Sequence, residues 1–283
     1  IDLEVLGLRQ PVFEKLRKEI GKPHGMIVAT GPTGSGKTTT LYAILLRLNK
    51  KESKIITLED PIEYKVEGIN QSQIDHTKDY TFAKGLRSVL RQDPDIVMVG
   101  EIRDLETAEI AIQAALTGHL MLSTVHTNDA AGALPRFLSM GVKPFLLAPA
   151  LNAILGQRLL RKVHQACKEN VTLEADVLAR VKKILSEIPS NSGETVNLEQ
   201  ATFVRGKGCD VCNHPGCKGR GGIYELLLIT PDVEQVVLAG SVSEYQLRDL
   251  AKAQGMVTML QDGLLKAAEG LTSVEEVLRV AQE

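Results

Sequence analysis

The residue pattern with the clearest chemistry is a glycine-rich segment near the start of the chain. Residues 31–38, GPTGSGKT, fit the spacing G-x-x-x-x-G-K-[ST], with an apolar run before them and a helical pattern after them. Glycines in such a loop let backbone N–H groups point at phosphate oxygens, and the following helix adds its positive N-terminus. A plain glycine-rich turn would not need both flanks, so we predict a nucleotide site.

Within this segment, Lys37 would reach the β- and γ-phosphates of ATP, and the Thr38 hydroxyl would be a ligand of Mg²⁺. We therefore expect ATP and Mg²⁺ as cofactors. The predicted nucleotide-binding residues are Gly31, Pro32, Thr33, Gly34, Ser35, Gly36, Lys37, Thr38 and Thr39.

Acidic residues follow two apolar runs, where they could position water or Mg²⁺. Residues 95–101, DIVMVGE, place Glu101 at the carboxyl end of an expected strand, which is where ligands of α/β sheets bind. Glu101 could polarise an attacking water, and a helix-capping carboxylate is the alternative. Residues 59–63, EDPIE, add Glu59 and Glu63, whose mutual repulsion a bound cation would offset. Taken alone, this second cluster is typical of a solvated turn.

Two histidines flank the apolar run at residues 120–124: His119 precedes it and His126 follows it. His126 would lie at the carboxyl end of the strand, on the nucleotide side. An imidazole there could sense the γ-phosphate or contact a neighbouring subunit. For His119, a structural hydrogen-bonding role is an equal alternative.

The four cysteines are Cys167, Cys209, Cys212 and Cys217, and the last three fall within nine residues. The chain has no secretion signal, so metal ligation is favoured over disulfides, with unligated thiols as the alternative.

The elements that must position these residues alternate between strands and helices. Continuous apolar runs predict strands buried on both faces, at Gly25–Thr30, Lys54–Leu58, Ile96–Val99 and Leu120–Thr124. Helical patterns separate them, at Thr38–Asn49, Thr81–Arg91, Leu105–Leu116 and Asp129–Met140. This alternation predicts an α/β fold with a mostly parallel sheet and helices on both faces.

The character of the chain changes after about residue 156. We expect a charged helix at Val171–Ile188, a polar loop at 189–193, and a glycine-rich segment at 206–222 with too few apolar residues for its own core. The tail from Ser243 to Glu283 predicts three short helices, separated at Gly255 and Gly270.

Composition excludes several classes of protein. The chain has 283 residues, which predicts about two domains. With 43% apolar and 24% charged residues, it is neither disordered nor fibrous. The formal net charge of −2 gives no overall basic footprint for nucleic acid.

The longest apolar candidate, Pro144–Gly156, is shorter than the ~18–20 residues that span a bilayer, so no transmembrane segment is expected. The start at Ile1 has neither an initiator Met nor a signal peptide, and we expect an excised fragment.

The sequence resembles one family in particular. The segments GPTGSGKTTTLYA, TLEDPIEY, LRQDPDIVMVGEIRD and GHLMLSTVHTNDA are similar to the Walker A, Asp-box, Walker B and His-box elements of the secretion ATPases of type II secretion and type IV pilus machines. The resemblance implies a RecA-like P-loop fold and ATP hydrolysis. It also implies catalytic roles for a set of residues in these boxes: Lys37, Glu59, Glu63, Glu101 and His126.

The same resemblance implies partners and a location. It suggests a homo-hexameric ring on the cytoplasmic face of the bacterial inner membrane, acting on a platform protein and the other cytoplasmic assembly components of the machine. Arginines complete such sites, and the candidates here are Arg87, Arg91 and Arg103, each with a surface ion pair as the alternative. A DNA translocase, a pilus retraction motor and a scaffold that binds ATP without turnover are competing interpretations. The absence of Trp and of a basic run argues against the DNA translocase.

Assembly-type members of this family carry a C-x-x-C…C-x-x-C zinc site, which retraction-type members generally lack. Here Cys209 and Cys212 form the second pair, whereas the first pair is His164 and Cys167, a departure that imidazole ligation of Zn²⁺ makes chemically sound. The fourth ligand stays open between His164 and Cys217, and we favour His164 because paired knuckles bring four ligands together with least strain.

These observations predict three parts. They are a RecA-like P-loop core at 1–160, a zinc-binding insertion at 161–225 and a C-terminal helical subdomain at 226–283.

Overall fold

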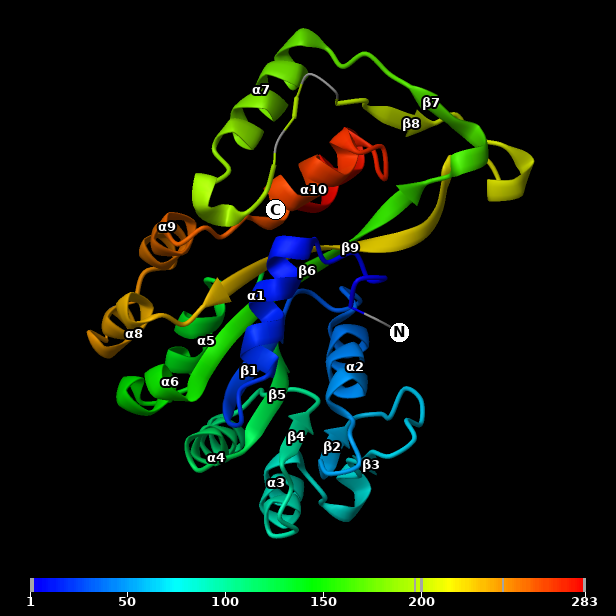
Figure 1. The fold of residues 1–283 in the computed structure, drawn as a ribbon. Coiled ribbons are helices and arrows are strands. Elements are labelled where there is room, and N and C mark those ends of the chain that lie inside the picture. The colour runs from blue at the N-terminus through cyan, green and yellow to red at the C-terminus, as the bar shows by residue number, and fades with distance from the viewer. Residues whose placement is uncertain (1–2, 196, 199–200, 241, 282–283) are drawn as a thin grey trace.

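A central sheet organises the computed structural model, which describes residues 3–195, 197–198, 201–240 and 242–281 (Figure 1). Over these residues the sheet has seven strands in the order β3-β2-β4-β5-β1-β6-β9. Neighbouring strands are parallel except for β6 and β9, which pair antiparallel. The strands are β1 (Gly25–Thr30), β2 (Ile55–Glu59), β3 (Asn70–Gln73), β4 (Ile96–Val99), β5 (Leu120–Val125), β6 (Leu151–Val163) and β9 (Cys217–Leu228).

Helices cover both faces of the sheet because alternate side chains of its central strands point to opposite sides. Met26 and Val28 of β1 belong to one apolar cluster, which also contains residues of six helices: α3 (Phe82–Leu90), α4 (Leu105–Leu116), α5 (Ala133–Ser139), α6 (Pro144–Ala150), α8 (Pro231–Leu238) and α9 (Glu244–Ala253). Ile27 and Ala29 pack against the other group, α1 (Gln10–Ile20) and α2 (Lys37–Leu48). The predicted α/β fold, with a mostly parallel sheet between two layers of helices, is confirmed.

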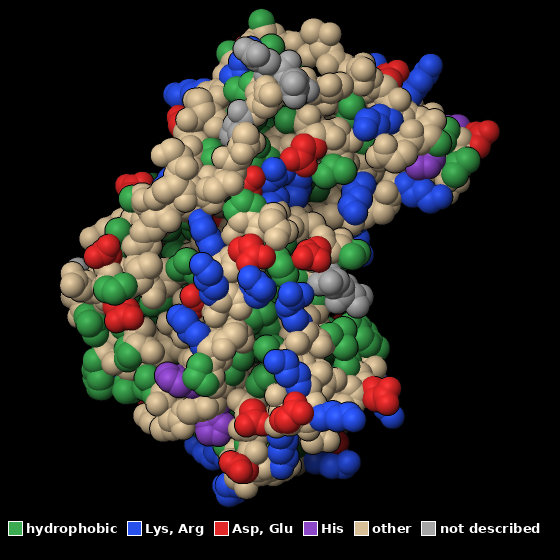
Figure 2. Space-filling model, in the orientation of Figure 1, with side chains coloured by type: hydrophobic (Ala, Val, Ile, Leu, Met, Phe, Trp, Pro, Cys, Tyr) green, Lys and Arg blue, Asp and Glu red, His purple; other side chains and the backbone are tan. Residues whose placement is uncertain are grey.

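Strands β6 and β9 continue beyond the sheet as a two-stranded arm (Figure 1). β6 pairs with β1 as far as Gly156, whereas its ladder with β9 reaches Val163. A separate apolar cluster forms along the arm, where Leu160 and Ile223 pack with α7 (Ala175–Ser186), α10 (Met259–Ala268) and α11 (Val274–Ala281). Strands β7 (Lys168–Asn170) and β8 (Val204–Gly206) form a small antiparallel sheet at its far end. Figure 2 shows that the molecule narrows where the arm leaves the larger lobe.

Most of the predicted elements are confirmed, and several boundaries are wrong. The helix predicted at Asp129–Met140 begins only at Ala133, because the groups before it form other hydrogen bonds. The helix predicted at Val171–Ile188 is shorter, since the Val171 N–H donates to the Phe203 carbonyl beside the β7–β8 pair. Short 3₁₀ turns complete the elements, at His76–Lys78, Gln165–Cys167, Ser190–Ser192 and Asp210–Cys212.

The predicted division into three parts stays a prediction. Strands β6 and β9 run across its boundaries at 160/161 and 225/226. Residues 1–2 and 282–283, where the first predicted part begins and the last one ends, lie outside the described residues. In the part of the chain that is described, no helix combines the length and the apolar character needed to span a bilayer.

A buried ion pair joins α10 to the arm. Lys266 Nζ lies 2.7 Å from Asp262 Oδ2 and 2.7 Å from the Gly222 carbonyl oxygen, and Asp262 also accepts the Tyr224 N–H at 2.8 Å. Burial lowers the pKa of Lys266 and raises the pKa of Asp262, while their mutual attraction opposes both shifts. Removing one partner would leave the other charge buried without compensation.

We therefore expect Lys266→Met to lower the free energy of unfolding by about 3–5 kcal/mol. The matched control is Lys84→Met, which breaks the exposed ion pair of Lys84 with Asp79 and should cost at most about 1 kcal/mol. Urea unfolding followed by circular dichroism measures both. Equal losses in the two variants would show that the buried pair has no special part in holding α10.

Candidate nucleotide site and metal centre

The glycine-rich segment forms the turn between β1 and α2, at the carboxyl edge of the sheet. Gly34 and Gly36 have φ values of +79° and +87°, the left-handed region that favours glycine. At Gly31, an added Cβ would lie 2.3 Å from the Gln157 carbonyl oxygen, so β6 leaves no room for a side chain there. Among the described residues, α2 has no side-chain cap at its N-terminus. Its first backbone N–H groups are therefore available to an anion, and the loop fits a phosphate.

Lys37 lies inside this turn. Its ammonium group donates to the carbonyl oxygens of Gly31 at 2.8 Å and of Pro32 at 3.0 Å. Burial lowers the pKa of Lys37, and the charge of Glu101 opposes that shift. The side chain is one wall of a cavity of 570 Å³, which is also lined by Thr33, Gly34, Gly36, Thr38, Thr39, Glu59, Glu63, Tyr64, Glu101, Arg103, Thr124, His126, Leu159 and Arg220.

Glu101 follows β4 and lies between two basic side chains in this cavity. Its Oε2 is 2.6 Å from Arg103 Nε and 3.3 Å from His126 Nε2. The carboxyl ends of the parallel strands β4 and β5 meet at the same edge of the sheet, which brings Glu101 and His126 together. A carboxylate in this position, opposite Lys37, has the chemistry to orient a water or to hold a cation.

Glu59 and Glu63 line the same cavity but differ in exposure. Glu59 is buried, accepts a hydrogen bond from the Tyr42 hydroxyl, and accepts one from Gln71 Nε2 at 3.1 Å. Burial and the adjacent Glu59 raise the pKa of Tyr42 well above its ordinary value, so Tyr42 stays a proton donor. Glu63 is exposed at the rim. The rings of Tyr42 and Tyr64 pack edge to face, with centroids 4.6 Å apart.

The other predicted residues lie elsewhere. His119 Nδ1 is 3.1 Å from the Ala114 carbonyl oxygen, and His119 lines a separate hollow together with Arg87. Arg87 pairs with Glu106 at 2.6 Å, and Arg91 is exposed and does not line the nucleotide cavity. Of the three predicted arginines, only Arg103 lies in the nucleotide cavity.

Sequence reasoning missed Arg220 and Leu159, which line the nucleotide cavity from the β6–β9 arm. Neither residue belongs to a recognisable motif. The only available signal was a basic residue within the glycine-rich segment at 206–222.

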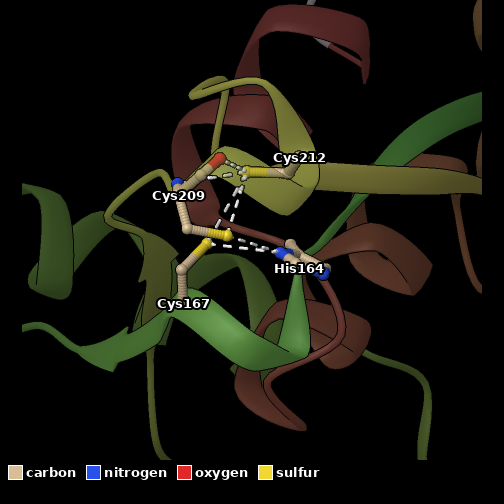
Figure 3. A group of neighbouring side chains, drawn as sticks. All are labelled: His164, Cys167, Cys209 and Cys212. Atoms are coloured by element: carbon tan, nitrogen blue, oxygen red, sulfur yellow. Dashed lines mark hydrogen bonds between the residues drawn. The ribbon is translucent and has the colours of Figure 1, made fainter.

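A second site lies at the end of the arm. His164, Cys167, Cys209 and Cys212 offer ligand atoms that all lie within 4.8 Å of one another. Figure 3 shows the imidazole pointing at the sulfurs of Cys167 and Cys209. His164 Nδ1 is 3.6 Å and 3.4 Å from these two sulfurs, and Cys212 Sγ is 3.9 Å from Cys167 Sγ and 3.7 Å from Cys209 Sγ.

These separations suit a tetrahedral metal ion. Bonds of about 2.3 Å to sulfur place neighbouring ligands about 3.8 Å apart. Burial opposes ionisation of Cys212, but hydrogen bonds from the N–H groups of Cys209 and Gly216 and from the Cys209 and Cys167 side chains together outweigh that effect and lower the pKa of the thiol to about 6. Cys217 pairs with Val163 in the ladder and is not part of the cluster. The cluster is therefore a Cys₃His set able to hold a metal.

The fold and the glycine-rich loop define a P-loop nucleotide-binding protein of the RecA-like type. Comparison with known families identifies it further: residues 1–279 match the model of the type II/IV secretion system protein family, and the chain belongs to that family.

Characterised relatives span more than this chain. It is 48% identical over 283 residues to the type II secretion system ATPase E of Vibrio cholerae, covering all of this chain and 54% of that protein. It is 45% identical over 277 residues to the type IV pilus assembly ATPase PilB of Thermus thermophilus, covering 98% of this chain and 30% of that protein. The chain thus spans about half the length of its type II secretion relatives.

Solved structures agree on the fold. The ATPase DotB of Legionella pneumophila superposes with a TM-score of 0.70 at 22% identity, covering all of this chain and 66% of DotB. The pilus retraction motor PilT, solved with bound ADP, superposes with a TM-score of 0.67 at 27% identity, covering all of this chain and 67% of PilT.

Proposed function

We propose that this chain is the ATP-hydrolysing part of a motor that assembles the fibre of a type II secretion system or a type IV pilus. The observation that carries the proposal is the position of Glu101, which shares one cavity with the P-loop and Lys37. Lys37 and the N-terminus of α2 would bind the phosphates, and Thr38 would hold Mg²⁺. Glu101 would orient the attacking water, with Glu59, Glu63 and His126 around it.

Family membership supports the assignment of this chain to such a machine. The relatives described above are named for type II secretion and for pilus assembly. The Cys₃His cluster favours assembly over retraction, in line with the expectation from the sequence. We further propose a homo-hexameric ring, bound peripherally to the cytoplasmic face of the inner membrane through a platform protein and the other assembly components of the machine, with no role for nucleic acid.

Two substitutions test the ATPase assignment. We expect Glu101→Gln to bind ATP with unchanged affinity. It should hydrolyse ATP at no more than about one hundredth of the wild-type rate, because the residue that orients water loses its charge. Lys37→Ala should lose nucleotide binding itself. Equilibrium binding of a fluorescent ATP analogue and phosphate release measure the two effects.

The matched control is Glu106→Gln, which removes the exposed partner of Arg87 outside the cavity. Hydrolysis by the Glu101 variant at the rate of this control would refute the role assigned to Glu101.

We also propose that the metal of the Cys₃His cluster is Zn²⁺, bound by Cys167, Cys209, Cys212 and His164. Three thiolates and one imidazole are a common structural ligand set for zinc. Zinc binding can contribute about 10–16 kcal/mol to the folding of a small segment. The segment at 206–222 is rich in glycine and contributes few residues to the apolar clusters, so it needs such a contribution.

The metal content of single variants tests this assignment. We expect one Zn²⁺ per chain in the wild type and in Cys217→Ser, but less than about half of that in Cys209→Ser. Atomic emission measures the metal. A chelator should make residues 160–225 sensitive to protease while the affinity for ATP persists. Loss of zinc in the Cys217 variant would indicate that Cys217, and not His164, is the fourth ligand.

A further inference from the structure

The loop between β5 and α5, residues 126–132, contacts the nucleotide cavity. The hydroxyls of Thr30 and Thr127 share a hydrogen bond of 2.5 Å, and the Thr30 hydroxyl also accepts the Thr127 N–H at 3.1 Å. Thr30 is the last residue of β1, immediately before the glycine-rich turn. His126, the next residue back along the loop, faces Glu101. The position of this β5–α5 loop therefore sets the position of the imidazole relative to the carboxylate.

The next residues of the β5–α5 loop are linked to two of the C-terminal helices, one directly and one through a side chain of β6. The Asn128 carbonyl accepts a hydrogen bond from the guanidinium of Arg158 at 3.3 Å, and Arg158 also donates to the Val280 carbonyl of α11 at 3.0 Å. Asp129 forms an ion pair with Arg248 of α9. Asn128 is thus linked to α11 through Arg158 of β6, and Asp129 contacts α9 directly.

Glu225 of β9 adds the contact to the third helix. This wholly buried carboxylate accepts the Ala130 N–H through Oε1 at 2.8 Å, and the N–H of Met259, the first residue of α10, through Oε2 at 3.1 Å. Gly156 lies directly between Glu225 and Thr30 in the strand register. A Cβ on Gly156 would lie 2.9 Å from Glu225 Cγ and 3.1 Å from the Ala130 nitrogen. Glycine at this position therefore lets the carboxylate reach the loop.

We propose that Glu225 is a positioning residue for nucleotide turnover, and that residues 127–130 couple the nucleotide cavity to helices α9, α10 and α11. A carboxylate is suited to this place because both of its oxygens accept, one from the loop and one from α10, whereas an amide accepts through one oxygen only. Movement of His126 and Thr127 on nucleotide binding then shifts the N-terminal end of α10 as well. This inference rests on the nucleotide binding proposed above.

Hydrogen exchange with and without the non-hydrolysable analogue AMP-PNP and Mg²⁺ tests the coupling. We expect the analogue to slow exchange of the amides at residues 256–262 in the wild type. In Glu225→Gln this response should be lost, kcat for ATP should fall about tenfold, and KM should change less than about twofold. Gly156→Ala should reproduce the effect, because its methyl group displaces the same carboxylate.

The matched control is Glu276→Gln. Glu276 is also buried and also joins a C-terminal helix to the arm, through Arg161, but it does not contact the β5–α5 loop. The Glu276→Gln variant should therefore keep the wild-type exchange response and the wild-type kcat. A wild type that binds the analogue without any change at 256–262, or a Glu225 variant that keeps the full response, overturns the coupling. If the wild type does not bind the analogue, the proposed function fails and the coupling fails with it.

Discussion

The pairing of β6 with β1 is the contact on which the rest of the molecule depends. β1 ends in the glycine-rich turn, and β6 lies against that turn: Gln157 Nε2 donates to the Ser35 carbonyl at 2.7 Å. The Gln157 carbonyl oxygen also occupies the space that a side chain on Gly31 would need. The shape of the phosphate loop is therefore set by a neighbouring strand as well as by its own glycines. The far end of that strand carries the Cys₃His cluster.

The arm formed by β6 and β9 is anchored in the sheet at one end and stops beside the Cys₃His cluster at the other. At one end it belongs to the apolar sheet, where Ile154 and Leu227 are buried. At the other end the ladder stops, and His164 and Cys167 come together with two cysteines that precede β9. A metal there would fix the ladder where apolar packing is sparse. Arg220 lies between the two ends and lines the nucleotide cavity. An ordered arm therefore also holds the Arg220 guanidinium at that cavity.

The sequence predicted the elements whose pattern is local. Continuous apolar runs identified β1, β2, β4 and β5, because strands buried on both faces need apolar residues at every position. The pattern gave no comparable signal for β9, which begins CKGRGG, or for β3, which is NQSQ on the edge of the sheet. These strands form because distant partners complete their hydrogen bonds. The helix predicted at Asp129–Met140 was too long for a similar reason. Asp129 forms an ion pair with Arg248, and Ala130 donates a hydrogen bond to Glu225, two residues that lie about 100 positions away in the sequence.

The same distinction between local and distant contacts separates the site residues that could be predicted from those that could not. Glu101 and His126 each follow a parallel strand, and parallel strands bring their carboxyl ends to one edge, so local patterns were enough to place both near Lys37. Arg220 and Glu225 come from an antiparallel strand that enters the sheet beside β6, and no local pattern identifies its register. Since that one strand lines the nucleotide cavity through Arg220 and holds the β5–α5 loop through Glu225, a displacement of β9 would move Arg220 in that cavity and change the position of His126 together.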